Sequence, residues 1–159
     1  MKKITYISTL EFTYTPHSGA HYLVNGHNQN HGQISESIVK HRLGLYTETN
    51  PSTSYDNGSD IEEYNASVKS ENASLAKDLH GTTNEQIKTF FKNVHSSVFV
   101  FVDFDDKTAE TSEWWMDKRE FGKFVRLFTR LDYDSKTHEP KIRFKSASRN
   151  MISWLDAQC

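Results

Sequence analysis

The chain has a single cysteine among its 159 residues, and this is the last residue, Cys159. An internal disulfide and a metal site built from several cysteines are therefore excluded. No segment approaches the roughly 18 to 20 apolar residues of a membrane span. The N-terminal stretch MKKITYISTLEF also lacks the uninterrupted apolar run of a secretory signal. We therefore expect a protein with no membrane segment that resides in the reducing cytoplasm.

The length is that of one ordinary domain with a hydrophobic core and is short for two. Strand-like and helix-like patterns alternate along the chain, and no internal repeat is present. We therefore expect residues 1–159 to form a single α/β domain with a mixed central sheet flanked by helices.

The pattern of apolar residues sets the expected elements. The run VFVFV in 96–104 indicates a central strand that is covered on both faces. Asp117 and Glu120 form a capping box at the start of a helix that ends near residue 128. The sequence NGHNQNHG is expected to be a loop, and one short strand is expected before Pro51. The expected strands are 3–14, 21–24, 96–104, 109–116 and 141–145, and the expected helices are 33–43, 82–94, 117–128 and 148–157.

Charge is unevenly distributed although the net charge is only −2. Residues 45–66 contain five acids and no lysine or arginine, whereas residues 116–149 contain ten basic and five acidic residues. An acidic pocket beside a basic surface suits an enzyme that holds a cation and binds a polyanion. Two differently charged solvent-exposed faces would give the same pattern. The candidate nucleic-acid-binding residues are Arg126, Arg130, Lys141, Arg143 and Lys145.

Polar and apolar side chains alternate in DIEEYNASVK, which begins at Asp60. If residues 64–65 form a two-residue loop, Asp60 lies opposite Lys69, and Glu62 lies opposite Ser67. All four side chains then share one face, because strand side chains alternate between faces. A three-residue loop would separate Asp60 from Lys69. The apolar residues share the other face: Ile61, Ala66 and Val68.

Phosphodiester hydrolysis requires the chemistry that such a face offers. A divalent cation held by carboxylate oxygens neutralises the phosphate and lowers the pKa of the attacking water. A nearby ammonium orients the water and stabilises the charge that develops on the phosphate. Asp60 with a second carboxylate would supply the first need, and Lys69 would supply the second. The alternative without a catalytic role is that Asp60 is an ordinary turn residue and Lys69 is a solvated lysine on a strand.

Asp60, followed by SVK ending at Lys69, resembles the site of the PD-(D/E)xK nuclease superfamily, whose members are restriction-endonuclease-like. Sites of this superfamily place an aspartate at the start of one strand and acid-x-lysine on the next. The resemblance implies an αβββαβ core over about residues 33–104, with C-terminal strand and helix additions. It also implies a Mg²⁺- or Mn²⁺-dependent endonuclease that acts on DNA, similar to nucleases of phages and mobile elements.

Two positions depart from the superfamily pattern: Ser59 stands where proline is usual, and Ser67 stands where the second acid is usual. Some members carry serine there and recruit a glutamate from the following helix. The resemblance then implies Asp60 as a metal ligand, Lys69 as the residue that positions or activates water, and Ser67 lining the site. The glutamates that could complete the metal site are Glu36, Glu62 and Glu85, with Glu63 and Glu71 as local competitors.

Two alternatives stay open. His17, His21, His27 and His31 could bind a cation, although their spacing matches no closed ligand set. The serine at position 67 also fits a non-catalytic nuclease-like protein that binds nucleic acid or inhibits a partner protein. A homodimer would let so small a protein address both strands of DNA.

Overall fold

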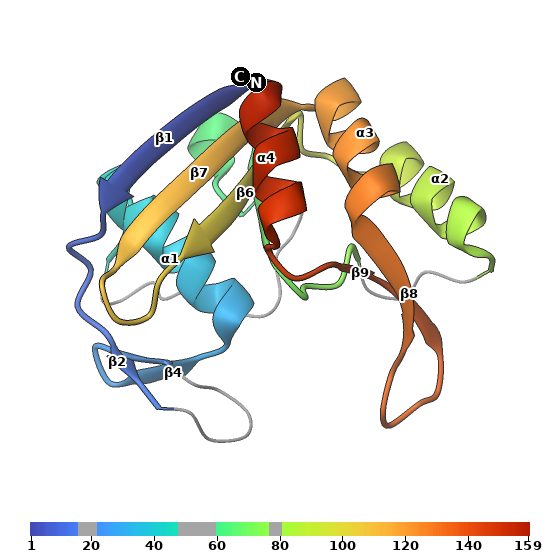
Figure 1. Cartoon of the computed structure of the whole chain (residues 1–159). Coiled ribbons are helices and arrows are strands. Elements are labelled where there is room, and N and C mark those ends of the chain that lie inside the picture. The colour runs from blue at the N-terminus through green and yellow to red at the C-terminus, as the bar shows by residue number, and fades with distance from the viewer. Residues whose placement is uncertain (16–21, 48–59, 77–80) are drawn as a thin grey trace.

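A four-stranded mixed sheet organises the chain (Figure 1). The computed structural model describes residues 1–15, 22–47, 60–76 and 81–159. The strands of the central sheet lie in the order β1 (Lys2–Ile7), β7 (Glu110–Asp117), β6 (Val98–Phe104) and β5 (Ala66–Ser70). Strands β5 and β6 are parallel, and the two other pairs are antiparallel. The expected fold class, α/β with a mixed sheet and flanking helices, is confirmed.

Helices cover both faces of this sheet. Helix α1 packs on one face, and three helices pack on the other (Figure 1). Strand β6 serves both layers, because Phe99 and Phe101 belong to the larger core while Val100 and Val102 face α1. All four side chains are fully buried, so the apolar run does form a central strand. The helices are α1 (His31–Arg42), α2 (Thr83–Asn93), α3 (Lys118–Phe128) and α4 (Arg149–Ala157).

Aromatic side chains dominate the core on the three-helix face. The ring centroids of Phe99 and Phe121 lie 4.2 Å apart with nearly parallel planes. Phe124 packs edge-on against Phe101 and stacks on Phe144. Burial of several rings in one cluster fixes α3 against β6 and the C-terminal segment.

Local capping signals start the helices where the sequence predicts. Asp117 caps α3 in a capping box: its carboxylate accepts a hydrogen bond from the backbone N–H of Glu120, and its own N–H donates to the Glu120 carboxylate. Thr82 and Glu85 form the same motif at the start of α2. Helix α4 follows Ser148, whose hydroxyl accepts a hydrogen bond from the N–H of Met151. All three helices were expected within one or two residues of these positions.

The N-terminal third differs from the expected single strand over 3–14. Strand β1 ends at Ile7 because its partner β7 begins at Glu110, and the chain then leaves the sheet. The sequence NGHNQNHG is also more ordered than expected, since Asn25 and Gly26 both have positive φ angles and form the turn of a hairpin. A second sheet results, made of β2 (Thr13–Tyr14), β3 (Tyr22–Val24) and β4 (His27–Gln29).

A hairpin follows α3 without a connecting loop. It consists of β8 (Thr129–Tyr133) and β9 (Pro140–Phe144), which pair antiparallel and project from the body of the molecule (Figure 1). Strand β9 was expected, with Ile142 and Phe144 facing inward, and both are buried. Strand β8 was not expected, because its exposed and polar residues carry little apolar periodicity.

The region around the candidate site is only partly described. The αβββαβ resemblance implies three strands between α1 and α2. The described residues there show β5, an antiparallel bridge between Ile61 and Ala66, and another from Ser74 to Arg143 of β9. The short strand expected before Pro51 lies outside the described residues. Within the described part of the chain, no helix is long and apolar enough to cross a membrane.

Candidate active site

The chain before β5 folds back along the free edge of that strand. Ile61 bridges Ala66, which places Asp60 beside Ser67 and corrects the expected pairing of Asp60 with Lys69 by two residues. The turn is longer than expected, because residues Glu62–Tyr64 form a 3-10 helix and Asn65 adopts a left-handed conformation. A shift of two residues preserves parity, so Asp60, Ser67 and Lys69 still share one face.

Asp60 is attached to β5 through its side chain. Its Oδ2 accepts a hydrogen bond of 2.7 Å from the backbone N–H of Val68. This N–H belongs to the edge strand of the sheet and would otherwise lack a ladder partner on that side. The contact fixes the Asp60 carboxylate next to the residue that precedes Lys69.

Lys69 points its ammonium into the protein rather than into solvent. The Nζ atom donates a hydrogen bond of 2.9 Å to the carbonyl oxygen of Leu75, on the segment that follows β5. Burial lowers the pKa of this ammonium, and the negative charges of Asp60 and Glu36 oppose that shift. Asp60 and Lys69, which the sequence analysis paired, are thus linked in the structure through Val68, the residue next to Lys69.

Glu36 is a buried carboxylate on α1. It is 6% exposed, and its Oε1 atom lies 2.8 Å from Nζ of Lys40, one turn along the same helix. A carboxylate is seldom buried to this extent unless it is paired. Of the three glutamates expected to complete the site, Glu36 is the one whose charge acts on Lys69 together with Asp60.

Ser67 stands where the superfamily resemblance would place a second acid. It is 8% exposed, and its hydroxyl lies 2.6 Å from that of Ser96, just before β6. Ser96 was not singled out from the sequence, because residues that enter neighbouring parallel strands show no pattern linking them. The pair of hydroxyls lines the site beside Asp60 but adds no charge.

Glu62 and Glu85 lie in other surroundings. Glu62 begins the exposed 3-10 helix and is not on the strand face where it was expected. Glu85 lies at the exposed start of α2, where its carboxylate accepts a hydrogen bond from the N–H of Thr82 and hydrogen bonds lower its pKa. Capping of α2 accounts for this residue.

A second pair of carboxylates lies at the carboxyl end of the parallel strands. The register of β5 and β6 sets Glu71 beside Asp103. Burial of Asp103 raises the pKa of its carboxyl, and the negative charges of Glu71 and Asp105 raise it further. Oε2 of Glu71 accepts a hydrogen bond of 2.6 Å from the N–H of Ala147. This repulsion between neighbouring acids was not foreseen from the sequence.

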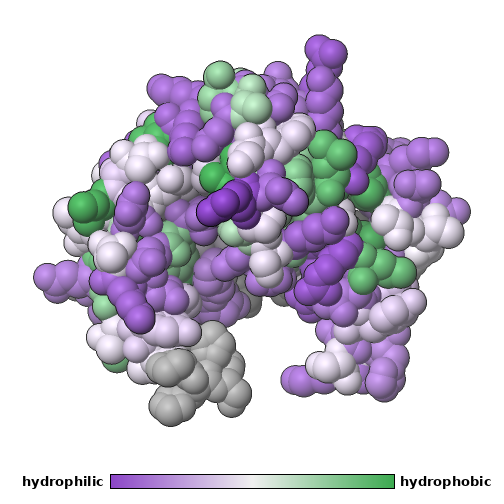
Figure 2. Space-filling model, viewed as in Figure 1, coloured by the Kyte–Doolittle hydropathy of each residue, from purple (hydrophilic) through white to green (hydrophobic). Residues whose placement is uncertain are grey.

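The segment after β5 connects the candidate site to the β8–β9 hairpin. Asn72 and Leu75 donate backbone hydrogen bonds to Phe144 and Ile142 of β9. Ser74 also bridges Arg143. The carbonyl that holds Lys69 thus belongs to a segment paired with β9, and the surface is hollowed beside the hairpin (Figure 2).

Three of the five basic residues expected to bind nucleic acid are already paired within this hairpin. Arg130 and Arg143 both contact Asp132, at 3.0 and 3.2 Å, and Lys141 contacts Asp134 at 2.9 Å. The remaining two, Arg126 on α3 and Lys145 after β9, are exposed.

The histidine alternative gains no support from the described residues. His31 begins α1, where its Nδ1 atom lies 3.1 Å from the Ser70 hydroxyl and its ring stacks on Phe104. His27 is exposed on β4, and His17 and His21 lie outside the described residues. Across the described ranges, no three side chains of histidine, cysteine, aspartate or glutamate are arranged to hold a metal ion.

The carboxylates of Asp60 and Glu36 nevertheless provide oxygen donors of the kind that Mg²⁺ prefers. Mg²⁺ commonly takes only one or two protein carboxylates and completes its coordination with water and substrate phosphate. The donor chemistry therefore fits this ion. Comparison of the chain with family models, curated proteins and solved structures finds no match.

Proposed function

We propose that the protein is a metal-dependent nuclease that hydrolyses DNA phosphodiester bonds with Mg²⁺ or Mn²⁺. The observation that carries the proposal is that the Asp60 carboxylate is held on β5 by the N–H of Val68, next to Lys69, whose ammonium points inward to the carbonyl of Leu75. Perturbed lysines with specific charge partners are typical of functional sites. Resemblance to the PD-(D/E)xK superfamily supplies the reaction class.

The roles follow from the chemistry of each side chain. Asp60 and Glu36 would hold the cation, which supplies charge neutralisation at the phosphate and a more acidic bound water. Lys69 would orient the attacking water and stabilise the charge that develops on the phosphate. Its lowered pKa brings the amine closer to the range in which lysine exchanges protons near neutral pH.

The arrangement of elements supports the same proposal. Helix α1 supplies Glu36, the edge strand β5 carries Lys69, and the crossover through α2 leads to the parallel strand β6. Of the αβββαβ core that the resemblance implies, the described residues contain the first helix, the site strand, the second helix and the buried strand, in that order. Cytoplasmic location and a homodimer stay predictions.

A second candidate is a non-catalytic protein of similar fold that binds nucleic acid or inhibits a partner protein. The observation that favours it is Ser67, whose hydroxyl pairs with Ser96 where a carboxylate would complete an ordinary site. A binding protein needs no cation, so its function would not depend on the charge of Asp60.

A DNA cleavage assay distinguishes the two candidate functions. Supercoiled and linear DNA are incubated with wild-type protein and Mg²⁺ or Mn²⁺, and with the Asp60→Ala, Lys69→Ala and Glu63→Ala variants. Glu63 was a competitor for the metal site, but it lies in the exposed 3-10 helix and not on β5, so it serves as the charge control. We expect cleavage by wild type and Glu63→Ala only, and none in EDTA. Cleavage that survives both site substitutions would refute the site, and bound but uncut DNA would favour the binding protein.

A further inference from the structure

The outer face of α3 carries a row of basic side chains. Lys118, Arg119, Lys123 and Arg126 are all exposed, and they recur over a little more than two turns of the helix. Gly122 lies within this row. We call this set of four basic residues the α3 face. Figure 2 shows hydrophilic residues at the surface where Figure 1 places α3, beside apolar ones.

The basic residues of the α3 face differ from those of the β8–β9 hairpin in whether acidic side chains pair with them. Lys118, Arg119 and Lys123 form no ion pair with any residue in the described ranges. Arg126 donates a hydrogen bond of 3.0 Å to the carbonyl of Gly122 and does not contact an acid. The paired arginines and lysine of the hairpin would have to give up Asp132 and Asp134 before they could neutralise phosphates. Cations without such partners attract a polyanion at a lower cost.

A hollow between α2 and α3 lies along this face. Its volume is about 540 Å³, and Phe91 of α2 provides an aromatic wall beneath Arg126, whose guanidinium carbon lies 5.7 Å from the ring centroid. At Gly122 a Cβ atom would lie 2.9 Å from an Arg126 nitrogen, so the absent side chain leaves room for the arginine. The hollow is lined by Phe91, Lys118, Arg119, Gly122, Lys123 and Arg126.

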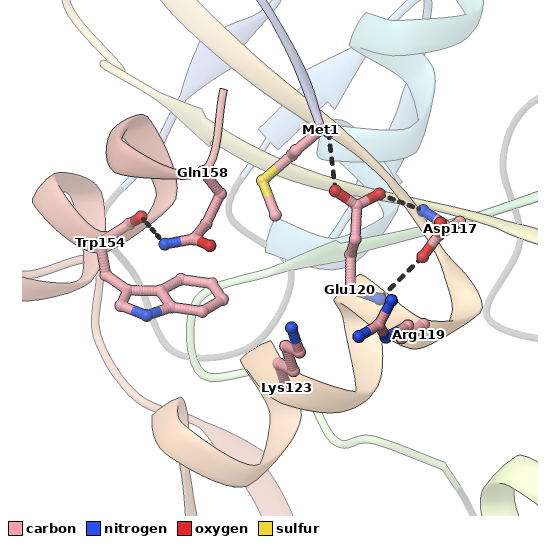
Figure 3. A pocket seen from close by; sticks show the side chains of 7 residues that line it. All are labelled: Met1, Asp117, Arg119, Glu120, Lys123, Trp154 and Gln158. Atoms are coloured by element: carbon pink, nitrogen blue, oxygen red, sulfur yellow. Dashed lines mark hydrogen bonds and ion pairs between the residues drawn. The ribbon is translucent and has the colours of Figure 1, made fainter.

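Arg119 and Lys123 also border a second hollow of about 270 Å³ on the other side of α3 (Figure 3). Two acids, Asp117 and Glu120, also line that hollow. Glu120 contacts the amino group of Met1 at 2.7 Å and accepts a hydrogen bond from the N–H of Asp117. Arg119 and Lys123 therefore lie on the ridge between the two hollows, and neither forms an ion pair with these acids.

We propose that the α3 face docks the phosphate backbone of double-stranded DNA. The nine residues from Lys118 to Arg126 are separated by eight steps of about 1.5 Å and so span about 12 Å along a helix, similar to the width of about 12 Å of the DNA major groove. The identity of the partner rests on the proposed function, whereas the surface rests on charge and shape. The row of cations would hold the duplex while the site at Asp60 and Lys69 acts on it.

Binding is measured separately from cleavage. The fluorescence anisotropy of a labelled 20-base-pair duplex is followed in EDTA at several salt concentrations. Three double variants remove the same amount of charge: Arg119→Gln with Lys123→Gln on the α3 face, Arg130→Gln with Arg143→Gln on the hairpin, and Lys2→Gln with Lys107→Gln as scattered exposed controls. Arg126 is left intact because it packs on Phe91. Circular dichroism checks that each variant is folded.

We expect the α3 variant to weaken binding about tenfold or more at low salt and to reduce the salt slope by about 2, since each lost phosphate contact removes about 0.9. The scattered variant should change affinity less than threefold. An equal or larger loss in the hairpin variant, or no binding by wild type, would overturn the inference. Competition with free tripolyphosphate is a further test. If tripolyphosphate displaces the labelled DNA at a lower total phosphate concentration than unlabelled duplex does, the α3 face is a site for small anions and the inference is overturned. If wild type binds DNA through the α3 face but cleaves no DNA, the nuclease proposal is refuted and the inference about the α3 face is retained.

Discussion

Asp60 is held against β5 by its own side chain, since its Oδ2 atom accepts a hydrogen bond of 2.7 Å from the N–H of Val68. This contact ties the segment before the turn to the strand that carries Lys69. It also means that the charge of Asp60 and its structural contact can be separated by mutation, because an amide oxygen accepts the same hydrogen bond that a carboxylate does.

The variant Asp60→Asn should lose activity without losing its fold. The asparagine carbonyl can still accept from Val68, so the free energy of unfolding should change by less than about 1 kcal/mol. Loss of the negative charge should lower the cleavage rate by about 100-fold or more, a size typical of removing one electrostatic catalytic group. Plasmid cleavage and urea denaturation measure the two effects. Equal cleavage by Asp60→Asn and wild type would contradict the assigned role.

Glu36 is expected to be the glutamate that completes the site. Glu36→Gln removes a charge that acts on Lys69, and cleavage should fall as it does for Asp60→Asn. Glu85→Gln is the matched control, because glutamine at this position still forms the capping box of α2. Activity should be unchanged in that variant. The assignment is wrong if Glu85→Gln loses cleavage and Glu36→Gln retains it.

The ion pair between Arg42 and Glu113 should be a main anchor of α1 on the sheet. Two hydrogen bonds of 2.6 and 2.7 Å join the guanidinium to a carboxylate that is fully buried. Tyr6 and Trp115 donate to the same carboxylate. Arg42→Met leaves the charge of Glu113 buried and unpaired, which should lower the free energy of unfolding by about 3 to 5 kcal/mol.

Urea denaturation measures this loss. The double variant Arg42→Met with Glu113→Gln should recover part of it, because the neutral amide no longer needs a cation while its oxygen still accepts hydrogen bonds. A loss below about 1 kcal/mol in the single variant would indicate that solvent reaches Glu113 once Arg42 is removed.

The raised pKa of Asp103 predicts how the stability of the fold depends on pH. Burial, Glu71 and Asp105 raise the pKa of its carboxyl above the unfolded value of about 4. The ionised carboxylate therefore destabilises the fold at neutral pH, and this cost disappears as the pH falls through the folded-state pKa toward the unfolded value. Asp103→Asn should raise Tm at pH 7, and the difference from wild type should vanish below about pH 4. Thermal unfolding across pH 3.5–7 tests the sign. A Tm difference that grows on acidification would contradict it.

Elements defined by neighbouring residues were predictable from the sequence. Helix α3 depends on Asp117 and Glu120 at its start and on an apolar stripe that recurs within the helix, so all its signals lie inside its own segment. The buried strand β6 is likewise visible as an apolar run. Strand β8 was missed because its stability comes from pairing with β9, which the sequence of β8 does not reveal.

The candidate site was predictable in composition but not in register. Alternation of side chains placed Asp60, Ser67 and Lys69 on one face, and a register shift of two residues leaves that result unchanged. The same shift carries Glu62 off the strand into an exposed turn. Turn length depends on how residues 62–65 fold against the rest of the chain, and alternation within a strand does not specify it.

The sequence by itself determined the fold class, the main helices and the residue types available for chemistry, because propensity, capping and apolar periodicity act between near neighbours. Only the tertiary structure decided that Asp60 is held on β5 by the N–H of Val68. It also decided that Arg130, Lys141 and Arg143 pair with acids whereas Lys118, Arg119 and Lys123 form no ion pair within the described residues. Electrostatic interactions depend on distance in space and on exclusion of water. Both quantities are set by how distant segments pack.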